Sequence, residues 1–303
     1  MSCQIVGVGH CCYDFLCTVE QYPPEDGSTH ILQIEHQGGG AAGTALVASS
    51  RLGIPSGIIA SWGNDETGRL IREGFEDENV CVTGAEIVPG GQSCVSYVMV
   101  HPENGTRTKF PCRDVLPPLH WSEAQKELLR GADVLHLDGT RYENALRAAQ
   151  LARSYGVTVS LDGCTVQPDN EKNLALVGLT DILIMNARYP FRVAGTDDTE
   201  KALRYFAALG PRVVITTGGS QGCTALIDGK LCRFPAYSVQ TVDTTGAGDV
   251  FHGAFLAAWL RKMDLPDCIR YASAASALKC TKMGGRAGIP THEAVLAFLQ
   301  SRV

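Results

Sequence analysis

The sequence predicts an α/β fold in which a mainly parallel central sheet is flanked by helices and carries a small β-sheet lid. From about residue 130 onward, short apolar runs alternate with helical patterns. Strands separated by helices imply crossover connections, and hence a parallel sheet that is covered on both faces. Two stretches within the first 110 residues instead pair apolar runs around turn residues, which predicts the separate lid.

The lid is expected from residues 12–36 and 92–110. The turn residues YPPEDGS interrupt the first stretch and HPENG interrupts the second, so each is typical of a pair of strands. No linker or low-complexity segment separates two independently folding halves. We therefore expect one domain over residues 1–303, with the lid built from these two segments.

Four short apolar runs supply expected strands of the large sheet: 132–137, 157–162, 181–186 and 212–217. Between the first two runs, ENALRAAQLARSYG has helical spacing and ends at Gly156. Between the last two runs, TEKALRYFAALG repeats the helical pattern. Ligands of such sheets bind beyond the carboxyl ends of the strands, and we expect the site there.

The composition narrows the function. The 303 residues include 26 basic and 32 acidic side chains, a formal net charge of −6 without basic blocks, which argues against nucleic-acid and anionic-membrane partners. No apolar stretch approaches the length of a transmembrane helix, and the start MSCQIVGVGHCC lacks the basic segment of a signal peptide. The 12 cysteines are scattered without CxxC pairs, so we expect reduced thiols and a cytoplasmic protein.

The strongest motif lies in VDTTGAGDVFHGAFLAAWLRK (242–262). Gly246 and Gly248 flank Ala247, so the backbone can approach a ligand without interference from a Cβ. Apolar residues with helical spacing follow, so this turn should open a helix whose free N–H groups and dipole favour an anion. Asp249 would lie in the first turn, where its carboxylate can accept a proton from a hydroxyl that attacks a phosphoryl group. An ordinary first-turn capping acid also fits this position.

The string DTTGAGD resembles the signature of the ribokinase-like (PfkB) carbohydrate kinases, and QGGGAAGTALVASSRLG (37–53) resembles their N-terminal Gly-Gly signature. The resemblance implies a three-layer ribokinase-like fold, with Asp249 as the catalytic base. It also implies an anion hole for the transferred phosphate at Gly246, Ala247 and Gly248. Within the family, DTTGAGDVFHGA and ALKCTKMGGRAGIP look closest to sulfofructose kinases and ketohexokinase-like members.

On the substrate side, the resemblance implies a set of sugar-binding residues: Asp14, Asp26, Gly39, Gly40, Thr44 and Arg107. Thr44 stands where many family sugar kinases have Asn, which affects the identity of the sugar. Lys109 is two residues from Arg107 and hence on the same strand face. Whether this pair reads an anionic substrate or forms an exposed basic edge is left open by the sequence.

For ATP, the resemblance implies binding by Asn186, Thr217, Gly219, Gly222, Thr244 and Gly285. Tyr189 replaces the Glu of the family's NxxE motif, so Mg²⁺ must depend on phosphate oxygens, water and the neighbourhood of Asp249. The family's monovalent-cation site, which suggests K⁺, would use Asp243 and Thr245 with carbonyls of residues 282–286.

These expectations favour an ATP-dependent kinase that phosphorylates a primary hydroxyl of a sugar or sugar derivative, with a ketose-like acceptor preferred. One alternative is a nucleoside kinase of the same family, which needs an aromatic base pocket for which Tyr13 and Phe15 are the nearby candidates. Another is a catalytically silent sugar or nucleotide sensor. By analogy with relatives, we expect a homodimer formed through the lid.

Overall fold

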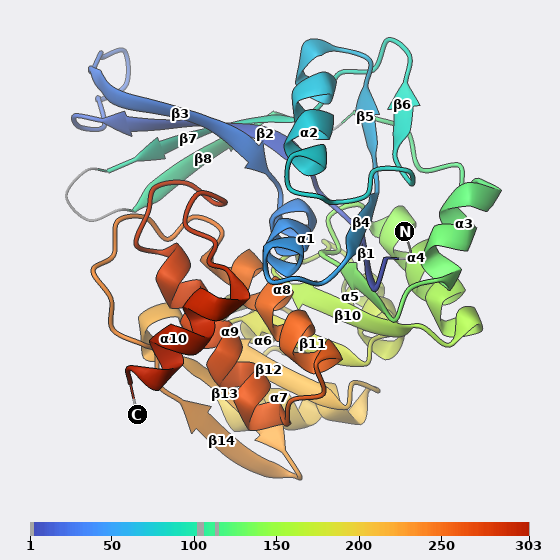
Figure 1. Cartoon of the computed structure of the whole chain (residues 1–303). Coiled ribbons are helices and arrows are strands. Elements are labelled where there is room, and N and C mark those ends of the chain that lie inside the picture. Colours follow the sequence, from blue (N-terminus) through green and yellow to red (C-terminus); the bar gives the residue numbers. More distant parts are fainter. Residues whose placement is uncertain (1–2, 102–105, 113–114, 303) are drawn as a thin grey trace.

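The computed structural model describes residues 3–101, 106–112 and 115–302, so most of the predicted HPENG turn lies outside the described residues. The central sheet has eight strands in the order β14-β13-β12-β11-β10-β9-β1-β4 (Figure 1). Its strands are β1 (Ile5–Val8), β4 (Ser56–Ile59), β9 (Val134–Leu137), β10 (Thr158–Gly163), β11 (Ile182–Asn186), β12 (Val213–Thr217), β13 (Cys223–Ile227) and β14 (Lys230–Phe234). All neighbours from β4 to β12 are parallel, and only the β13 and β14 edge is antiparallel, which confirms the predicted sheet.

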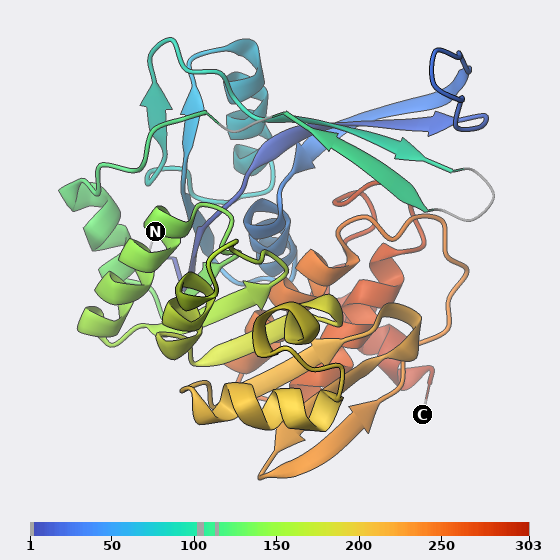
Figure 2. The same cartoon turned by 180° about the vertical axis from the view of Figure 1, so that it is seen from behind.

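Helices cover both faces of this sheet, and Figures 1 and 2 show the two helical layers from opposite sides. One layer contains α1 (Ala41–Arg51), α8 (Ala247–Leu260), α9 (Leu265–Lys279) and α10 (His292–Gln300). The opposite layer contains α4 (Tyr142–Tyr155), α5 (Asn170–Gly178), α6 (Arg188–Ala194) and α7 (Thr199–Ala208). Each layer has its own buried cluster against the sheet, as expected for apolar strands covered on both faces.

Helix α8 is packed on several sides, which explains its apolar sequence. It lies between α1 and α9 and against the sheet (Figure 1). A Cβ on Gly253 would lie 2.2 Å from the carbonyl oxygen of Ala45, so glycine permits the close approach of α8 to α1. A helix with buried residues around most of its circumference keeps a fixed position, and this helix carries the predicted catalytic segment at its N-terminus.

A second sheet projects from the domain (Figures 1 and 2). This sheet, called the lid below, has the strand order β3-β2-β7-β8. Its strands are β2 (Cys12–Val19), β3 (Ile31–Gly39), β7 (Val95–Val100) and β8 (Arg107–Pro111). Both predicted strand pairs are antiparallel hairpins, and β2 pairs with β7 in parallel. Leu16, Val98 and Val100 form a small buried cluster on one face of the lid.

The remaining elements lie beside β4. They are the strand pair β5 (Ser61–Gly63) and β6 (Glu86–Val88) with α2 (Glu66–Glu76) and α3 (Glu123–Arg130). In the described part of the chain, no helix is long and apolar enough to cross a membrane. All 12 cysteines lie in the described part of the chain, and none of them forms a disulfide.

Candidate active site

The first turn of helix α8 contains the predicted anion hole. Gly246 precedes the helix with a φ of 73°, a left-handed conformation that glycine adopts without strain. At Gly248 no other atom lies within 4 Å of the position that a Cβ would take, so the backbone there faces open space. The N–H group of Ala247 donates to the carbonyl of Thr244 over 3.2 Å. The open side of the turn is nevertheless accessible to an anion.

Asp249 is half-buried in the same turn. Burial, followed by the negative charge of Asp162, raises the pKa of Asp249 to about 7. Lys109 of the lid and His252, which lies one turn along α8, act in the opposite direction. A carboxyl group with this pKa can accept a proton near neutral pH, as a general base must.

Gly246 is the point where three segments distant in sequence meet. A Cβ on Gly246 would lie 3.0 Å from the Cα of Gly285 and 3.3 Å from the Cγ2 of Thr44. Thr44 is buried in the first turn of α1, whose N-cap is Gly40 with a φ of 89°. A Cβ on Gly40 would collide with the carbonyl of His10 at 2.2 Å. The structure thus places both predicted Gly-rich signatures around one space.

Asp14 is positioned by the lid strand β2 and lies directly against Gly39. A Cβ on Gly39 would lie 2.1 Å from the Oδ2 of Asp14, so only glycine leaves room for this carboxylate. Burial raises the pKa of Asp14. The Cys12 thiol, which donates to Oδ1 over 3.1 Å, acts to lower this pKa. The positive charges of Lys109 and Arg286 also act to lower it.

Two basic side chains of the lid face the same space. Arg107 and Lys109 lie on one face of β8, since side chains two residues apart on a strand point to the same side. Arg107 donates through Nη1 to the Oγ1 of Thr244 over 2.9 Å, which joins the lid to the loop before α8. Lys109 favours the ionised forms of both Asp14 and Asp249, so its charge acts on both ends of the site.

Sequence reasoning missed Asp138, which organises the floor of the site. Its Oδ2 accepts the backbone N–H groups of His10 over 2.7 Å and Ala42 over 3.1 Å, and its Oδ1 accepts that of Thr140 over 2.9 Å. Asp138 is fully buried and immediately follows β9. The signal was present in the sequence, because a carboxylate directly after an apolar strand lies at the ligand-binding edge of a parallel sheet.

A buried ion pair lies behind Asp249 and was also missed. His252 Nε2 on α8 lies 3.2 Å from the Oδ1 of Asp162 at the end of β10. Burial lowers the pKa of His252, but the charge of Asp162 and the hydrogen bond to it, together with the charges of Asp249 and Asp138, raise this pKa overall. Burial together with the charge of His252 instead lowers the pKa of the neighbouring His136 to about 3. Among these buried groups, the pair of Asp162 and a protonated His252 is favoured.

The predicted nucleotide residues lie at the carboxyl ends of β11 and β12. Asn186 and Thr217 are register partners at the ends of these two strands, as expected for one side of a nucleotide site. Gly219 and Gly222 follow with φ values of 58° and 79°. A Cβ on Gly222 would collide with the carbonyl oxygen of Phe234 at 2.0 Å, so glycine is required at this turn.

The position of the missing NxxE glutamate is apolar. Tyr189 is buried there, and its ring centroid lies 5.8 Å from that of Phe206. Asn186 uses its Oδ1 to accept the N–H groups of Arg188 and Tyr189, which starts α6. Within the described ranges, no group of three or more His, Cys, Asp or Glu side chains is arranged to hold a metal ion. A divalent ion would therefore take most of its ligands from phosphate and water.

Asp243 and Thr245 do not fit the expected K⁺ site. Oδ1 of Asp243 accepts the N–H and the Oγ1–H of Thr245 over 2.8 and 2.7 Å, and Oδ2 accepts the N–H of Gly284 over 2.7 Å. The carbonyl oxygen of Asp243 accepts the Nζ of Lys279 over 2.8 Å. Each of these three oxygens therefore already has a protein donor, and the donor to the carbonyl oxygen of Asp243 is itself an ammonium group.

Asp26 is not brought to the other predicted residues. It is exposed, with a φ of 61°, in the connection between β2 and β3. Strand β2 extends over eight residues, about 26 Å at ~3.3 Å per residue, and carries this connection to the far end of the lid (Figure 1). The remaining predicted residues lie around the α8 turn, along the strand ends or on the inner face of the lid.

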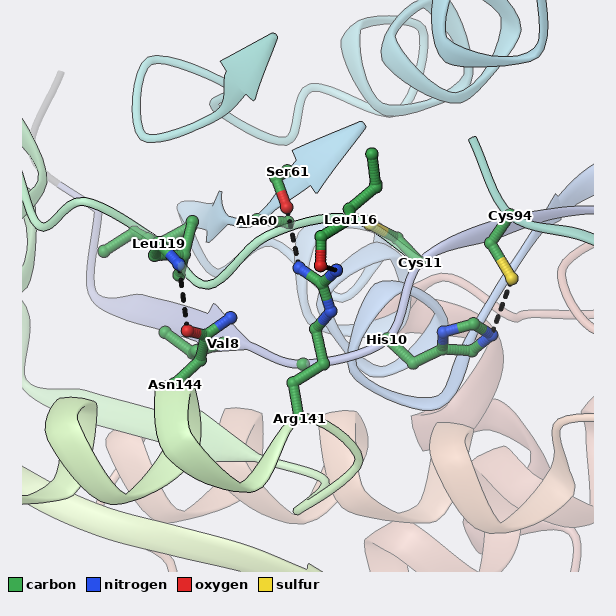
Figure 3. Close-up of a pocket in the computed structure, with 12 residues that line it drawn as sticks. Val8, His10, Cys11, Ala60, Ser61, Cys94, Leu116, Leu119, Arg141 and Asn144 are labelled. Carbon is green, nitrogen blue, oxygen red and sulfur yellow. Dashed lines mark hydrogen bonds between the residues drawn. The ribbon is translucent and has the colours of Figure 1, made fainter. Parts of the chain in front are cut away.

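A small pocket borders the floor of the site (Figure 3). Its volume of about 10 Å³ has room for roughly one water molecule. Arg141 points across it and donates to the Oγ of Ser61 over 2.7 Å and to the carbonyl of Leu116 over 2.9 Å. His10 and Cys94 face each other over 3.9 Å on the other side. This pocket is too small for a sugar or a nucleotide.

The chain is similar to known kinases over nearly its whole length. It is 32% identical over 299 residues to an ATP-dependent ribose-1-phosphate kinase of Halopiger xanaduensis, with 99% of each chain covered. It is 27% identical over 305 residues to a nucleoside kinase of Methanothermobacter thermautotrophicus, with 97% of this chain and 95% of that one covered. None of the similarities described here is to a sulfofructose kinase or a ketohexokinase, so that finer likeness stays a prediction.

The fold is similar to that of a ribokinase of known structure. The structure of Arabidopsis thaliana ribokinase complexed with ribose and ATP matches with a TM-score of 0.86 at 25% identity, covering 99% of each chain. The predicted ribokinase-like fold is therefore confirmed. Residues 3–292, which include the central sheet and the lid, match the description "pfkB family carbohydrate kinase". The anion turn before α8, the Gly-rich start of α1 and the relatives all lead to one conclusion: the chain belongs to the PfkB family of carbohydrate kinases.

Proposed function

We propose that the protein transfers the γ-phosphate of ATP to a primary hydroxyl of a sugar or sugar derivative, with Asp249 as the base. The placement of Asp249 carries this proposal. A carboxyl group with a pKa of about 7 lies in the first turn of a helix whose opening backbone faces open space. A base beside an anion site is what phosphoryl transfer to a hydroxyl requires.

In the proposed step, the acceptor oxygen forms a bond to the γ-phosphorus while the bond from this phosphorus to the β,γ-bridging oxygen breaks. The hydroxyl proton passes to Asp249, and ADP leaves with the bridging oxygen. The anion hole at Gly246, Ala247 and Gly248 stabilises the negative charge on the transferred group. Arg107, which donates to Thr244 beside this turn, adds a positive charge on the acceptor side of the site.

We infer that ATP lies across the carboxyl ends of β11 and β12 and reaches the α8 turn. The residues proposed to contact it are Asn186, Thr217, Gly219, Gly222, Thr244 and Gly285. The name of the Halopiger relative, an ATP-dependent kinase, supports the donor. Mg²⁺, when bound, neutralises part of the charge of the phosphates. Tyr189 offers no carboxylate to this ion.

The acceptor is proposed to bind between Asp14, Gly39, Gly40, Thr44 and the basic face of the lid. Asp14 can accept hydrogen bonds from sugar hydroxyls, while Lys109 can pair with an anionic substituent. Since the Halopiger relative is named a ribose-1-phosphate kinase, we infer that a phosphorylated ribofuranose is the first acceptor to test. The ketose favoured by the sequence motifs is the second.

The nucleoside alternative is less well supported by the lid. Asp14 faces the site, so Tyr13 and Phe15, its neighbours on β2, point to the opposite face. The ring of Phe15 stacks on Tyr97 with centroids 5.2 Å apart and lies 4.6 Å from His36. Tyr13 is half-buried against the main core, and its ring centroid lies 5.7 Å from that of Phe15. Both candidate aromatic residues therefore lie on the face of β2 opposite to Asp14, which argues against a base pocket at the acceptor site.

The test is acceptor-dependent ADP release with Mg-ATP, measured on ribose 1-phosphate, ribose, ketoses, sulfofructose and nucleosides. The Asp249→Asn variant runs in parallel. Turnover by the wild type alone supports the kinase and identifies its acceptor. A melting-temperature shift by a sugar or nucleotide, without turnover of any acceptor, supports the silent sensor instead and contradicts the proposal.

We also propose a homodimer formed through the outer face of the lid, and a cytoplasmic location. The outer face exposes large apolar side chains: Ile31, Leu32, Ile34, Tyr97 and Phe110. A patch of this kind on a projecting sheet is typical of a protein–protein contact. The free thiols of all 12 cysteines support a reducing compartment.

A further inference from the structure

Lys279 is a charged side chain in an unusual place. It is the last residue of α9 and has no exposed surface. Lysine is almost never fully buried unless it is paired, because removal of an ammonium group from water is costly. The C-terminal end of a helix, with its partial negative charge, offsets some of this cost. The rest must come from the groups that surround Nζ.

Those groups belong to the loop that forms the anion hole. Nζ of Lys279 donates to the carbonyl oxygen of Asp243 over 2.8 Å. The N–H groups of Val242 and Asp243 donate to the carbonyl of Cys280 over 2.8 and 3.2 Å. The end of α9 therefore holds the start of this loop at three points. Burial lowers the pKa of Lys279, while the negative charges of Asp243 and Asp249 favour the protonated ammonium.

The ammonium of Lys279 binds Asp243, which precedes Gly246 of the anion hole by three residues. Asp243 is also a residue that was expected to bind a monovalent cation. Oδ1 of the Asp243 carboxylate accepts two hydrogen bonds from Thr245, and Oδ2 accepts one from Gly284. The carbonyl of Arg286, in the segment expected to supply further ligands, accepts Nη1 of Arg51 over 2.7 Å. A metal cation would lose these ligands to protein donors and would be repelled by the ammonium.

We infer that the Lys279 ammonium is the built-in cation of this site: it positions the anion-hole loop, and the enzyme needs no K⁺. Lys279 acts through the loop and touches no reacting atom, so it is a positioning residue. Its charge holds Asp243 in place and thereby keeps the N–H groups of the α8 turn in the geometry that binds the phosphate.

The first arm compares KCl, NaCl and tetramethylammonium chloride at equal ionic strength on the wild type. We measure kcat, KM for ATP and the melting temperature with Mg-ADP bound. We expect kcat and KM to agree within about twofold among the three salts, because no site for a monovalent cation remains. Saturable activation of about tenfold or more by K⁺, or a melting temperature that rises in K⁺ alone, overturns it.

The second arm uses Lys279→Met, which keeps most of the side-chain length and removes the charge, with Lys201→Met on the exposed face of α7 as the matched control. We expect Lys279→Met to lower kcat by about tenfold or more, with a smaller change in KM, since the anion hole acts mainly on the transition state. The control should behave as the wild type. A folded Lys279→Met protein with unchanged kcat and melting temperature contradicts the inference.

If Lys279→Met does not fold, the wild-type salt series still decides the question. The kinetic readouts rest on the proposed function, but the melting temperature with Mg-ADP does not require turnover. Absence of turnover in every salt would therefore count against the proposed function, whereas a K⁺-specific melting shift would count against the built-in cation.

Discussion

The large sheet and the lid contribute to one site, but their packing differs. Strands β1 and β9 are buried at every residue, whereas six of the nine residues of β3 and four of the five residues of β8 are exposed. Asp249 is held on a helix enclosed by α1, α9 and the sheet. Arg107 and Lys109 are held on an edge strand that pairs only with β7 within the described lid.

The difference separates two tasks. Groups that act on the transferred phosphate need fixed positions, which a packed core supplies. Groups that recognise the acceptor can lie on a mobile, exposed element, where a substitution changes affinity without disturbing the core. We therefore expect core substitutions to lower kcat and lid substitutions to change KM for the acceptor.

The largest expected effect is that of Asp249→Asn. Asn cannot accept the hydroxyl proton, and general-base catalysis contributes ~10²–10⁴-fold, so we expect kcat to fall by about 10³-fold while Mg-ADP still binds. The measurement is steady-state ADP release together with calorimetric binding of Mg-ADP. A variant that binds Mg-ADP and keeps kcat within a few-fold of the wild type would remove Asp249 from the base role.

The same variant should be more stable than the wild type at pH 8. Because the pKa of Asp249 is raised above its unfolded value, the protonated form favours the folded state, and this contribution is lost as the pH rises through about 7. Asn stays neutral at every pH. A melting temperature above that of the wild type at pH 8, with the gap narrowing at pH 5, checks both the folding of the variant and the raised pKa.

The next effect is that of the lid cations. We expect Arg107→Met and Lys109→Met each to raise KM for an anionic acceptor by about tenfold, the value of one lost charge-assisted contact, with a smaller change in kcat. Lys126→Met on α3 is the control, because that lysine pairs with Glu123 away from the site. If kcat falls as far as with Asp249→Asn while KM stays constant, the division of tasks between core and lid is wrong.

The smallest effect on catalysis is expected on the outer face of the lid. Phe110 is 54% exposed there, and Phe110→Ser should weaken the proposed dimer while the core of each subunit keeps its stability. Sedimentation velocity over a range of concentrations measures the dissociation. A protein that is monomeric before the substitution, or equally dimeric after it, contradicts a dimer formed through this face.

Much of the fold followed from local patterns. The apolar runs 132–137, 157–162, 181–186 and 212–217 became β9 to β12 because strands buried on both faces must be apolar along their length. The Gly-rich turns at Gly40 and Gly246 were predictable because their backbones require positive φ angles. The resemblance to the family supplied the roles, which spacing alone could not assign.

The missed residues depend on tertiary contacts. Asp138 receives N–H groups from residues more than 90 positions away, and His252 meets Asp162 only once α8 packs against β10. Lys279 appeared as one of several lysines near the C-terminus, and only the folded chain shows that it is buried against Asp243. Asp26 was predicted at the site, but the structure places it elsewhere, because β2 is long enough to carry the following turn to the far end of the lid.

If an ionised Asp249 starts the transfer from its packed position on α8, the pH dependence of kcat/KM shows it most directly. With Mg-ATP held saturating, we expect a plateau at alkaline pH and a decline of about tenfold per unit below pH ~7, because protonated Asp249 cannot act as a base. The residual activity of Asp249→Asn should lack this limb, which separates the titration of Asp249 from that of ATP itself. A wild-type profile that is flat from pH ~5.5 to ~8.5, or a limb that persists unchanged in the variant, would contradict the role of Asp249 as the base.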